Sequence, residues 1–121
     1  MRALVFAAFA AASLFVSSHA NAQSQQDFQL VNRTGYTIDE VYVSAAAQNT
    51  WGDDLMGEDS LEDRQVLNVT FPRGADACSF DIKVVYDDAE TAEFRGVNLC
   101  RVSRVTLFYN RSAGTTRFTT E

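Results

Sequence analysis

The sequence predicts an all-β fold, namely an antiparallel β-sandwich of about seven strands, immunoglobulin-like, with one disulfide. Three observations support this prediction. Seven short segments rich in Val, Ile, Thr, Tyr and Phe occur along the chain, with turn-forming residues between them. Several segments alternate apolar and polar residues, as half-buried strands do. The chain has 2 cysteines and a leader typical of exported proteins, whose cysteines usually pair.

The leader is a predicted secretory signal peptide, residues 1–22. A positive start at Arg2 precedes an apolar run at residues 3–16, which is short for a membrane span, and an Ala-Asn-Ala cleavage pattern ends at Ala22. We expect cleavage after this alanine, which leaves residues 23–121 as a single β-sandwich domain that is periplasmic or secreted. No later stretch reaches the roughly 18 apolar residues that a membrane helix requires.

The strand segments follow a polar stub at residues 23–26 that we expect to be frayed. They are predicted at residues 28–32, 38–44, 65–71, 79–87, 91–97, 104–110 and 115–119. The fourth segment alternates most clearly. One of its faces is apolar and consists of Cys78, Phe80, Ile82, Val84 and Tyr86. The other face is polar apart from Val85 and carries Ser79, Asp81, Lys83 and Asp87.

The two cysteines, Cys78 and Cys100, are predicted to form the disulfide. Closing a loop of this size contributes about 3 kcal/mol on the chain-entropy model, a large share of the stability of a small domain. The alternative is a pair of free thiols, but a C-x21-C spacing matches no redox or zinc motif.

The connection between the second and third segments is long and acidic. Its residues 49–63, NTWGDDLMGEDSLED, contain six carboxylates, two glycines and the only tryptophan of the chain. We expect the first part of this insert to form a single helical turn with Trp51, Leu55 and Met56 directed inward.

Charge limits the classes of partner. The chain has 10 basic and 16 acidic residues, for a net charge of −6, and loss of Arg2 and His19 with the leader changes it to −7 and removes the only histidine. A strongly acidic protein is repelled by phosphate backbones and by anionic lipid, so nucleic acid and membrane surfaces are poor partners. Basic proteins, cationic ligands and hard cations fit better, and we expect a monomer.

The residue types also exclude most enzyme classes. Without a histidine, residues 23–121 contain no Ser-His-Asp triad, no Cys-His pair and no histidine-based zinc site. Paired carboxylates such as Asp53/Asp54 or Asp87/Asp88 could serve glycoside hydrolysis, which needs two carboxyls about 5 to 10 Å apart across a cleft. Neighbouring carboxylates in a turn are more often solvated. We therefore expect a protein that is not an enzyme, with a small carboxylate-based hydrolase as the least favoured alternative.

Calcium is the plausible ion, because only oxygen ligands are available. Neither Asp53 nor Asp54 begins a segment that matches an EF-hand loop. A different calcium site could be built from Asp53, Asp54, Glu58 and Asp59. Because acidity alone is a weak signal, we expect no cofactor and a solvated insert, with calcium as the alternative.

The tryptophan of the insert has two interpretations. Trp51 could fill an open end of the sandwich, which is the commoner fate of a lone tryptophan in a small β domain. It could instead be an exposed contact for a partner, since tryptophan is enriched at binding hot spots. Together with Asp53, Asp54, Glu58 and Asp59 it forms the candidate binding set.

Three stretches resemble a family of small secreted bacterial β-sandwich domains. They are NRTGYTIDEVYVS at residues 32–44, WGDDLMG at 51–57, and CSFDIKVVYDD at 78–88, the last followed by NLC at 98–100. They match TGYxIxxVYVS, WGxDxLG and CxFDIKVxYxD motifs in the same order and span most of residues 23–121. The resemblance implies a β-sandwich with one disulfide and no established biochemical function.

The chain departs from these motifs at two positions. Met56 stands in place of a leucine, and Ala89 in place of a turn glycine, which puts the type of that turn in doubt. Some members of the family carry the label argininosuccinate lyase. That label does not fit this chain, because such a lyase is a large helical cytoplasmic tetramer.

The sequence thus favours an exported, non-catalytic interaction module of unknown partner that presents the acidic insert, residues 49–63, to a protein or small ligand. The alternative is a calcium-binding domain whose insert is ordered by the ion.

Overall fold

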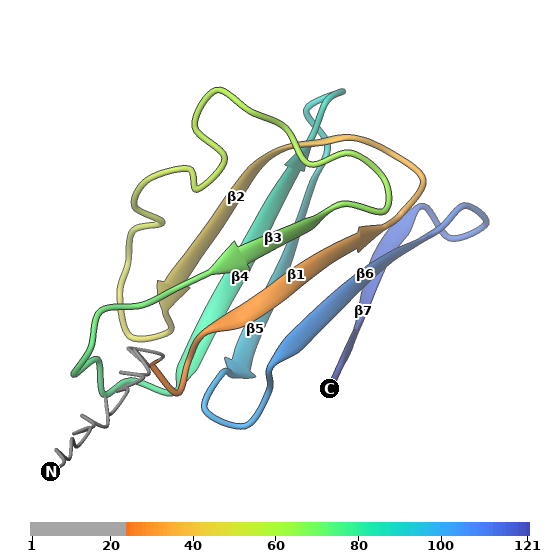
Figure 1. The fold of residues 1–121 in the computed structure, drawn as a ribbon. Helices are drawn as coiled ribbons and strands as arrows, with labels where there is room; N and C mark the ends of the chain where they lie inside the picture. Colours follow the sequence, from red (N-terminus) through yellow and green to blue (C-terminus); the bar gives the residue numbers. More distant parts are fainter. Residues whose placement is uncertain (1–23) are drawn as a thin grey trace, which may run out of the picture.

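The computed structural model describes residues 24–121, and the predicted signal peptide lies outside the described residues. The described part of the chain consists of strands, turns and loops, with no helix (Figure 1). The strands are β1 (Phe28–Arg33), β2 (Ile38–Ala45), β3 (Val66–Val69), β4 (Ser79–Tyr86), β5 (Thr91–Asn98), β6 (Arg104–Asn110) and β7 (Thr115–Thr120). All seven predicted segments are therefore confirmed as strands, and only β3 is shorter than predicted at both ends.

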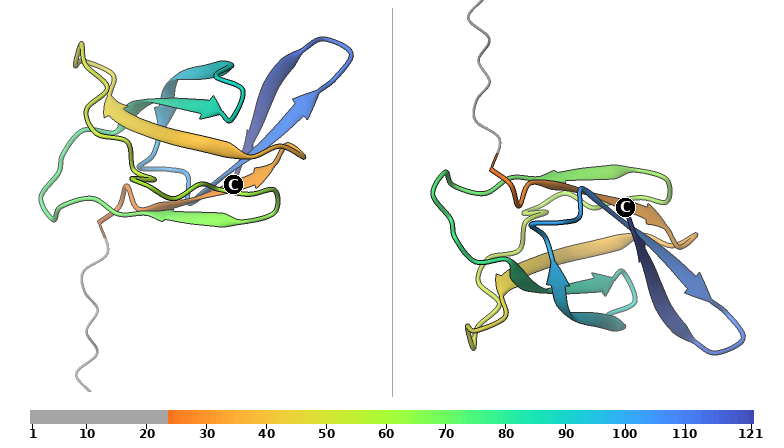
Figure 2. Two further views of the ribbon diagram at one scale, coloured as in Figure 1. Left: turned by 90° about the horizontal axis from the view of Figure 1, so that it is seen from above. Right: turned by 90° about the horizontal axis from the view of Figure 1, so that it is seen from below.

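The strands form a β-sandwich of two sheets, with the orders β3-β1-β6-β7 and β2-β4-β5. Figure 2 shows the two layers from their edges, with the β6–β7 hairpin extending beyond them. Four of the five strand pairs are antiparallel, as predicted, whereas β1 and β6 run parallel. The division into four and three strands is that of an immunoglobulin constant domain, but here β1 and β2 belong to different sheets.

The core lies between the sheets and is built from the alternating apolar positions. As predicted, one face of β4 is buried, and it consists of Phe80, Ile82, Val84 and Tyr86. The facing sheet contributes Leu30, Val105 and Leu107, each with 0% exposure. Burial of such a side chain contributes about 1.5 to 3 kcal/mol, so the period of two is enough to fix which face of each strand turns inward.

The disulfide joins Cys78 to Cys100, with their Cα atoms 5.1 Å apart, which confirms the predicted pairing. Cys78 directly precedes β4, and Cys100 lies in the turn after β5. The bridge therefore links two neighbouring strands at one end of the smaller sheet.

The residues that precede β1 are ordered by the rest of the fold, so the expectation of a frayed stub is wrong for Gln26. This side chain has 0% exposure, and its Nε2 donates to the carbonyl oxygens of Ala75 (2.7 Å) and Ala77 (2.9 Å). The hydroxyl of Ser24 donates to the carbonyl oxygen of Phe71 at 2.9 Å. The sequence could not indicate this, because the acceptors lie about 50 positions away.

The long insert covers the free edge of β2. Leu55 donates its backbone N–H to the carbonyl of Val41 (2.8 Å), and Ile38 and Leu61 exchange both of their backbone hydrogen bonds. Satisfying these groups protects an edge that would otherwise pair with other chains. No helix in the described residues is long and apolar enough to cross a membrane.

Candidate functional site

The insert, residues 49–63, is the candidate site predicted from the sequence. It contains a hydrogen-bonded turn over residues 55–58 in place of the expected helical turn, with Asp59 N–H donating to the Met56 carbonyl at 2.9 Å. Met56 is buried, as expected, but Leu55 is 44% exposed, so the expectation that it points inward is wrong. Trp51 is half-buried.

Trp51 lies on the outer face of the β2-β4-β5 sheet. Its ring centroid is 6.5 Å from that of Tyr42, 5.8 Å from Nζ of Lys83 and 5.2 Å from Cζ of Arg95. Both cations lie at distances at which an indole ring attracts positive charge. The tryptophan is therefore held in place by cation–π contacts and keeps part of its surface in solvent, rather than being buried between the sheets.

Arg95 is itself positioned by a buried carboxylate. Asp81 lies on the polar face of β4, as the alternation predicts, and it is nevertheless only 5% exposed because Arg95 and Trp51 lie on the same side. It lies opposite a bulge, where Phe80 pairs with Val97 and the next pair places Ile82 opposite Phe94. The carboxylate of Asp81 accepts hydrogen bonds from Gly96 N–H (2.9 Å) and from Nη1 of Arg95 (3.0 Å).

Asp54 has a structural role in the insert. Its Oδ1 accepts the backbone N–H groups of Val41 and Met56, each at 2.9 Å. The side chain thus holds the insert against β2 and satisfies two backbone donors that the turn would leave free. This use of Asp54 separates it from the other candidate carboxylates.

A groove lies beside Trp51 at the end of the sandwich where β2 ends and β4 begins. We name it the Trp51 groove, and its volume is about 430 Å³. Its apolar lining includes Trp51, Val43, Leu55, Phe71 and Phe80, and its acidic residues are Asp53 and Asp76. Both carboxylates are exposed. The groove combines an apolar floor with a negatively charged margin.

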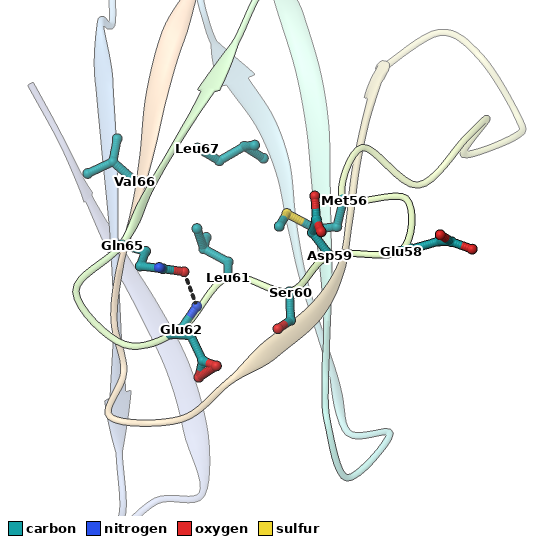
Figure 3. A pocket seen from close by; sticks show the side chains of 9 residues that line it. All are labelled: Met56, Glu58, Asp59, Ser60, Leu61, Glu62, Gln65, Val66 and Leu67. Carbon is teal, nitrogen blue, oxygen red and sulfur yellow. Dashed lines mark hydrogen bonds between the residues drawn. The ribbon is translucent and has the colours of Figure 1, made fainter.

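The other two candidate carboxylates, Glu58 and Asp59, line a different hollow of about 670 Å³ between the insert and β3. In Figure 3, Met56 and Leu61 face this hollow, while Glu58 lies at its margin with its carboxylate directed opposite to the Met56 side chain. Val66 of the same hollow is 45% exposed. The predicted set is thus divided between two separate surfaces.

Calcium would require several of these carboxylates to converge. Within residues 24–121, no three His, Cys, Asp or Glu side chains are grouped in a way that could hold a metal ion. The physical reason is that Asp54 is directed at backbone N–H groups, whereas Asp53 and Glu58 are directed to different surfaces.

The sequence did not indicate one cluster of three tyrosines. Tyr36, Tyr86 and Tyr109 meet at the opposite end of the sandwich around a cavity of about 120 Å³ that Asp87, Asp88 and Glu90 also line. The acidic turn after β4 is visible in the sequence, but the tyrosines come from three separate parts of the chain. Only the arrangement of the sheets brings them together.

Comparison with known proteins bears on the fold. No family model matches the chain, and no curated protein matches it. Among solved structures, the chain is similar to the NMR structure of a protein from Eubacterium rectale, with 13% sequence identity, a TM-score of 0.53, and coverage of 78% of this chain and 85% of that one. At this identity the likeness extends to the fold alone, and that fold is a β-sandwich.

Proposed function

We propose that the protein is an exported, non-catalytic interaction module that holds a basic, partly apolar segment of a partner protein in the Trp51 groove. The observation that carries the proposal is the exposure of large apolar groups next to free carboxylates. Leu55 is 44% exposed and Trp51 is half-buried, and Asp53 and Asp76 lie exposed beside them.

The apolar part of the groove supports a protein partner rather than a small ion. Tryptophan is among the residues that contribute most to binding energy when a partner removes it from water. Trp51 is already oriented by Arg95 and Lys83, so binding would cost little side-chain entropy. A preorganised aromatic beside an apolar floor favours an extended segment with apolar side chains.

The charge of the groove supports a basic partner. Asp53 and Asp76 take part in no ion pair among the described residues, so both are available to a cation. The chain as a whole has a net charge of −6. Long-range attraction of this sign accelerates the encounter with a basic partner and repels an acidic one.

Export and the lack of catalysis are part of the same proposal. The leader at residues 1–22 supports a periplasmic or secreted location, and the resemblance to small secreted bacterial domains supports the same location. Both cysteines are used in the disulfide, and residues 24–121 contain no histidine. Residues 24–121 therefore offer neither a Ser-His nor a Cys-His pair for nucleophilic catalysis.

Site-directed photo-crosslinking in the native host tests the proposal. A photoreactive phenylalanine analogue replaces Leu55 in the groove or, as a matched control, Glu58, which is exposed in the same insert but directed elsewhere. We expect the Leu55 position to capture a protein at a segment rich in lysine or arginine. Asp53→Lys combined with Asp76→Lys should abolish that capture. Equal capture from both positions, or capture that survives the charge reversal, would contradict the proposal.

A further inference from the structure

We infer that the protein has a second binding site, independent of the Trp51 groove, in which three tyrosines bind a quaternary ammonium group. The site lies between the β1–β2 connection, the end of β4 with the turn that follows it, and the end of β6, whose strands are labelled in Figure 1. We call Tyr36, Tyr86 and Tyr109 the tyrosine cage.

The three rings stand nearly perpendicular to one another. The interplanar angles are 84° for Tyr36 and Tyr86, 79° for Tyr36 and Tyr109, and 82° for Tyr86 and Tyr109. The corresponding centroid distances are 6.3, 5.2 and 5.9 Å. The rings pack edge to face against one another, and all three residues line the same cavity of about 120 Å³. Aromatic walls around a small space are the arrangement that binds quaternary ammonium groups.

The cage is rigid at its base and open at its rim. Tyr86 is 5% exposed, and its hydroxyl shares a hydrogen bond of 2.7 Å with Oγ1 of Thr116. Tyr36 is 39% exposed, but its backbone is held because Nδ2 of the buried Asn32 donates to its carbonyl at 2.8 Å. A ligand can therefore enter past Tyr36 without displacing a core residue.

The remaining walls are acidic. Asp87, Asp88 and Glu90 line the cavity, and all three come from the β4–β5 turn. The turn is fixed by the hydrogen bonds of Tyr86 N–H to the Glu90 carbonyl (2.8 Å) and of Glu90 N–H to Oδ1 of Asp88 (2.9 Å). The carboxylates add a long-range attraction to the short-range attraction of the rings.

The electrostatics of the cage agree with this geometry. Burial, followed by the charge of Glu90, raises the pKa of Tyr109, and burial raises the pKa of Tyr86 above its ordinary value. The guanidinium of Arg111 already lies 5.8 Å from the centroid of Tyr36. A cation of the protein itself is thus drawn to the exposed wall of the cage.

The class of cation follows from the donors that are available. Within residues 24–121 no carboxylate group is arranged to hold a metal ion. A primary ammonium is strongly hydrated and is paired well by carboxylates alone, whereas a methylated ammonium carries its charge on an apolar surface that also suits the three aromatic walls. A zwitterion with its own carboxylate would be repelled by the acidic residues.

Nuclear magnetic resonance titration of the purified protein with choline tests the inference. We expect saturable shifts of the backbone amide signals of Tyr36, Glu90 and Tyr109, with a dissociation constant in the millimolar range. The matched control ligand is 3,3-dimethyl-1-butanol, the neutral carbon analogue of choline, which should give no such shifts. Titration with a trimethyllysine peptide distinguishes two sources of the ammonium group. Tighter binding of the peptide than of choline indicates a methylated protein as the ligand, and weaker binding indicates a small molecule.

Variants test separately the aromatic ring and the hydroxyl of Tyr36, the attraction by Glu90 and the competition by Arg111. Tyr36→Leu should weaken choline binding about 5- to 10-fold, whereas Tyr36→Phe should keep it within about twofold. Glu90→Gln should weaken it, and Arg111→Gln should strengthen it, because an internal competitor is removed. Tyr42→Leu, at the other aromatic cluster, should leave choline binding unchanged.

Three results would overturn the inference: no saturable shift with choline in the millimolar range, an equal response to the neutral analogue, or equal binding by Tyr36→Leu and Tyr36→Phe. Each is independent of the Trp51 groove, so the two proposals can fail separately.

Discussion

The carboxylate of Asp81 lies 3.0 Å from Nη1 of Arg95, and the guanidinium of that arginine lies 5.2 Å from the centre of the Trp51 ring. A buried acid in β4 thus helps to position a half-buried indole on the outer face of the sheet. Gly96 makes this arrangement possible. Its φ of +68° allows a bulge in the strand, and the bulge directs the N–H of Gly96 toward the same carboxylate.

We predict that Asp81→Ala lowers the free energy of unfolding by about 1 to 3 kcal/mol, because it leaves the N–H of Gly96 without its acceptor. Urea unfolding measures this change. Asp59→Ala, at an exposed carboxylate, should stay within about 0.5 kcal/mol of the parent protein. The emission of Trp51 should also shift in Asp81→Ala, since Arg95 loses one of its two carboxylate partners and keeps only Glu93. Similar losses in both variants would refute the link.

Asp54 provides the second prediction. Asp54→Ala removes the acceptor of two backbone N–H groups and should lower the free energy of unfolding by about 1 to 2 kcal/mol. Hydrogen exchange of the Val41 amide should accelerate in the same variant. Asp53→Ala, one residue away and exposed, should change neither quantity.

The same pair of variants addresses calcium. If Asp54 acts through backbone hydrogen bonds, thermal unfolding is the same with millimolar calcium and with a chelator, for the parent protein and for Asp53→Ala. A calcium-dependent rise in the melting temperature that Asp53→Ala removes would instead support a metal-ordered insert.

The positions of the strands could be predicted because the period of two is a local property of the sequence. Phe80, Ile82, Val84 and Tyr86 are buried as that pattern requires. The same pattern places Asp81 on the polar face but does not indicate that it is buried there, because a bulge in the neighbouring strand supplies donors that a single strand does not reveal. Local periodicity therefore predicts which face of a strand is apolar, but it does not predict which polar residue a neighbouring strand buries.

Contacts between residues far apart in the sequence explain the other features that the sequence did not predict. The parallel contact of β1 with β6 joins residues about 75 positions apart, and nothing in either segment specifies it. Leu55 was expected to be buried because it is apolar, but Met56 and Asp54 supply the contacts that hold the insert. The tyrosine cage likewise depends on the β1–β2 connection and the ends of β4 and β6, which belong to different sheets and come together only in the folded sandwich.

Tyrosine ionisation should make the protein less stable at high pH. Burial raises the pKa of Tyr86, and a hydrogen bond to Glu40 raises the pKa of Tyr42 to about 12, from an ordinary value of 10.0. The folded state therefore keeps protons that the unfolded state loses first. Stability is fully present below pH 10 and falls as the pH rises through the folded pKa values.

Urea unfolding between pH 8 and pH 11, followed by Trp51 fluorescence, measures this loss. Ultraviolet titration should find that tyrosines ionise at higher pH in the native protein than in urea. In Tyr86→Phe the decline above pH 10 should be shallower. Native and unfolded proteins that ionise at the same pH would disprove the assignment.

In the turn after β4, by contrast, we predict a substitution that stabilises the protein. Ala89 adopts φ +73°, a left-handed conformation that a side chain disfavours, and it closes a tight turn in which its N–H donates to the Tyr86 carbonyl at 2.9 Å. Ala89→Gly should therefore raise the free energy of unfolding by about 1 kcal/mol, because relief of the strain exceeds the entropy that glycine costs.

The matched control is Ala113→Gly in the β6–β7 turn, where the backbone is not in the left-handed region. There the added freedom of the unfolded chain has no strain to offset it, so stability should fall by about 0.4 to 1 kcal/mol. Urea unfolding of the two variants side by side tests the sign. If both substitutions destabilise the protein, Ala89 is not strained, and the turn that carries Asp88 and Glu90 is held by its hydrogen bonds alone.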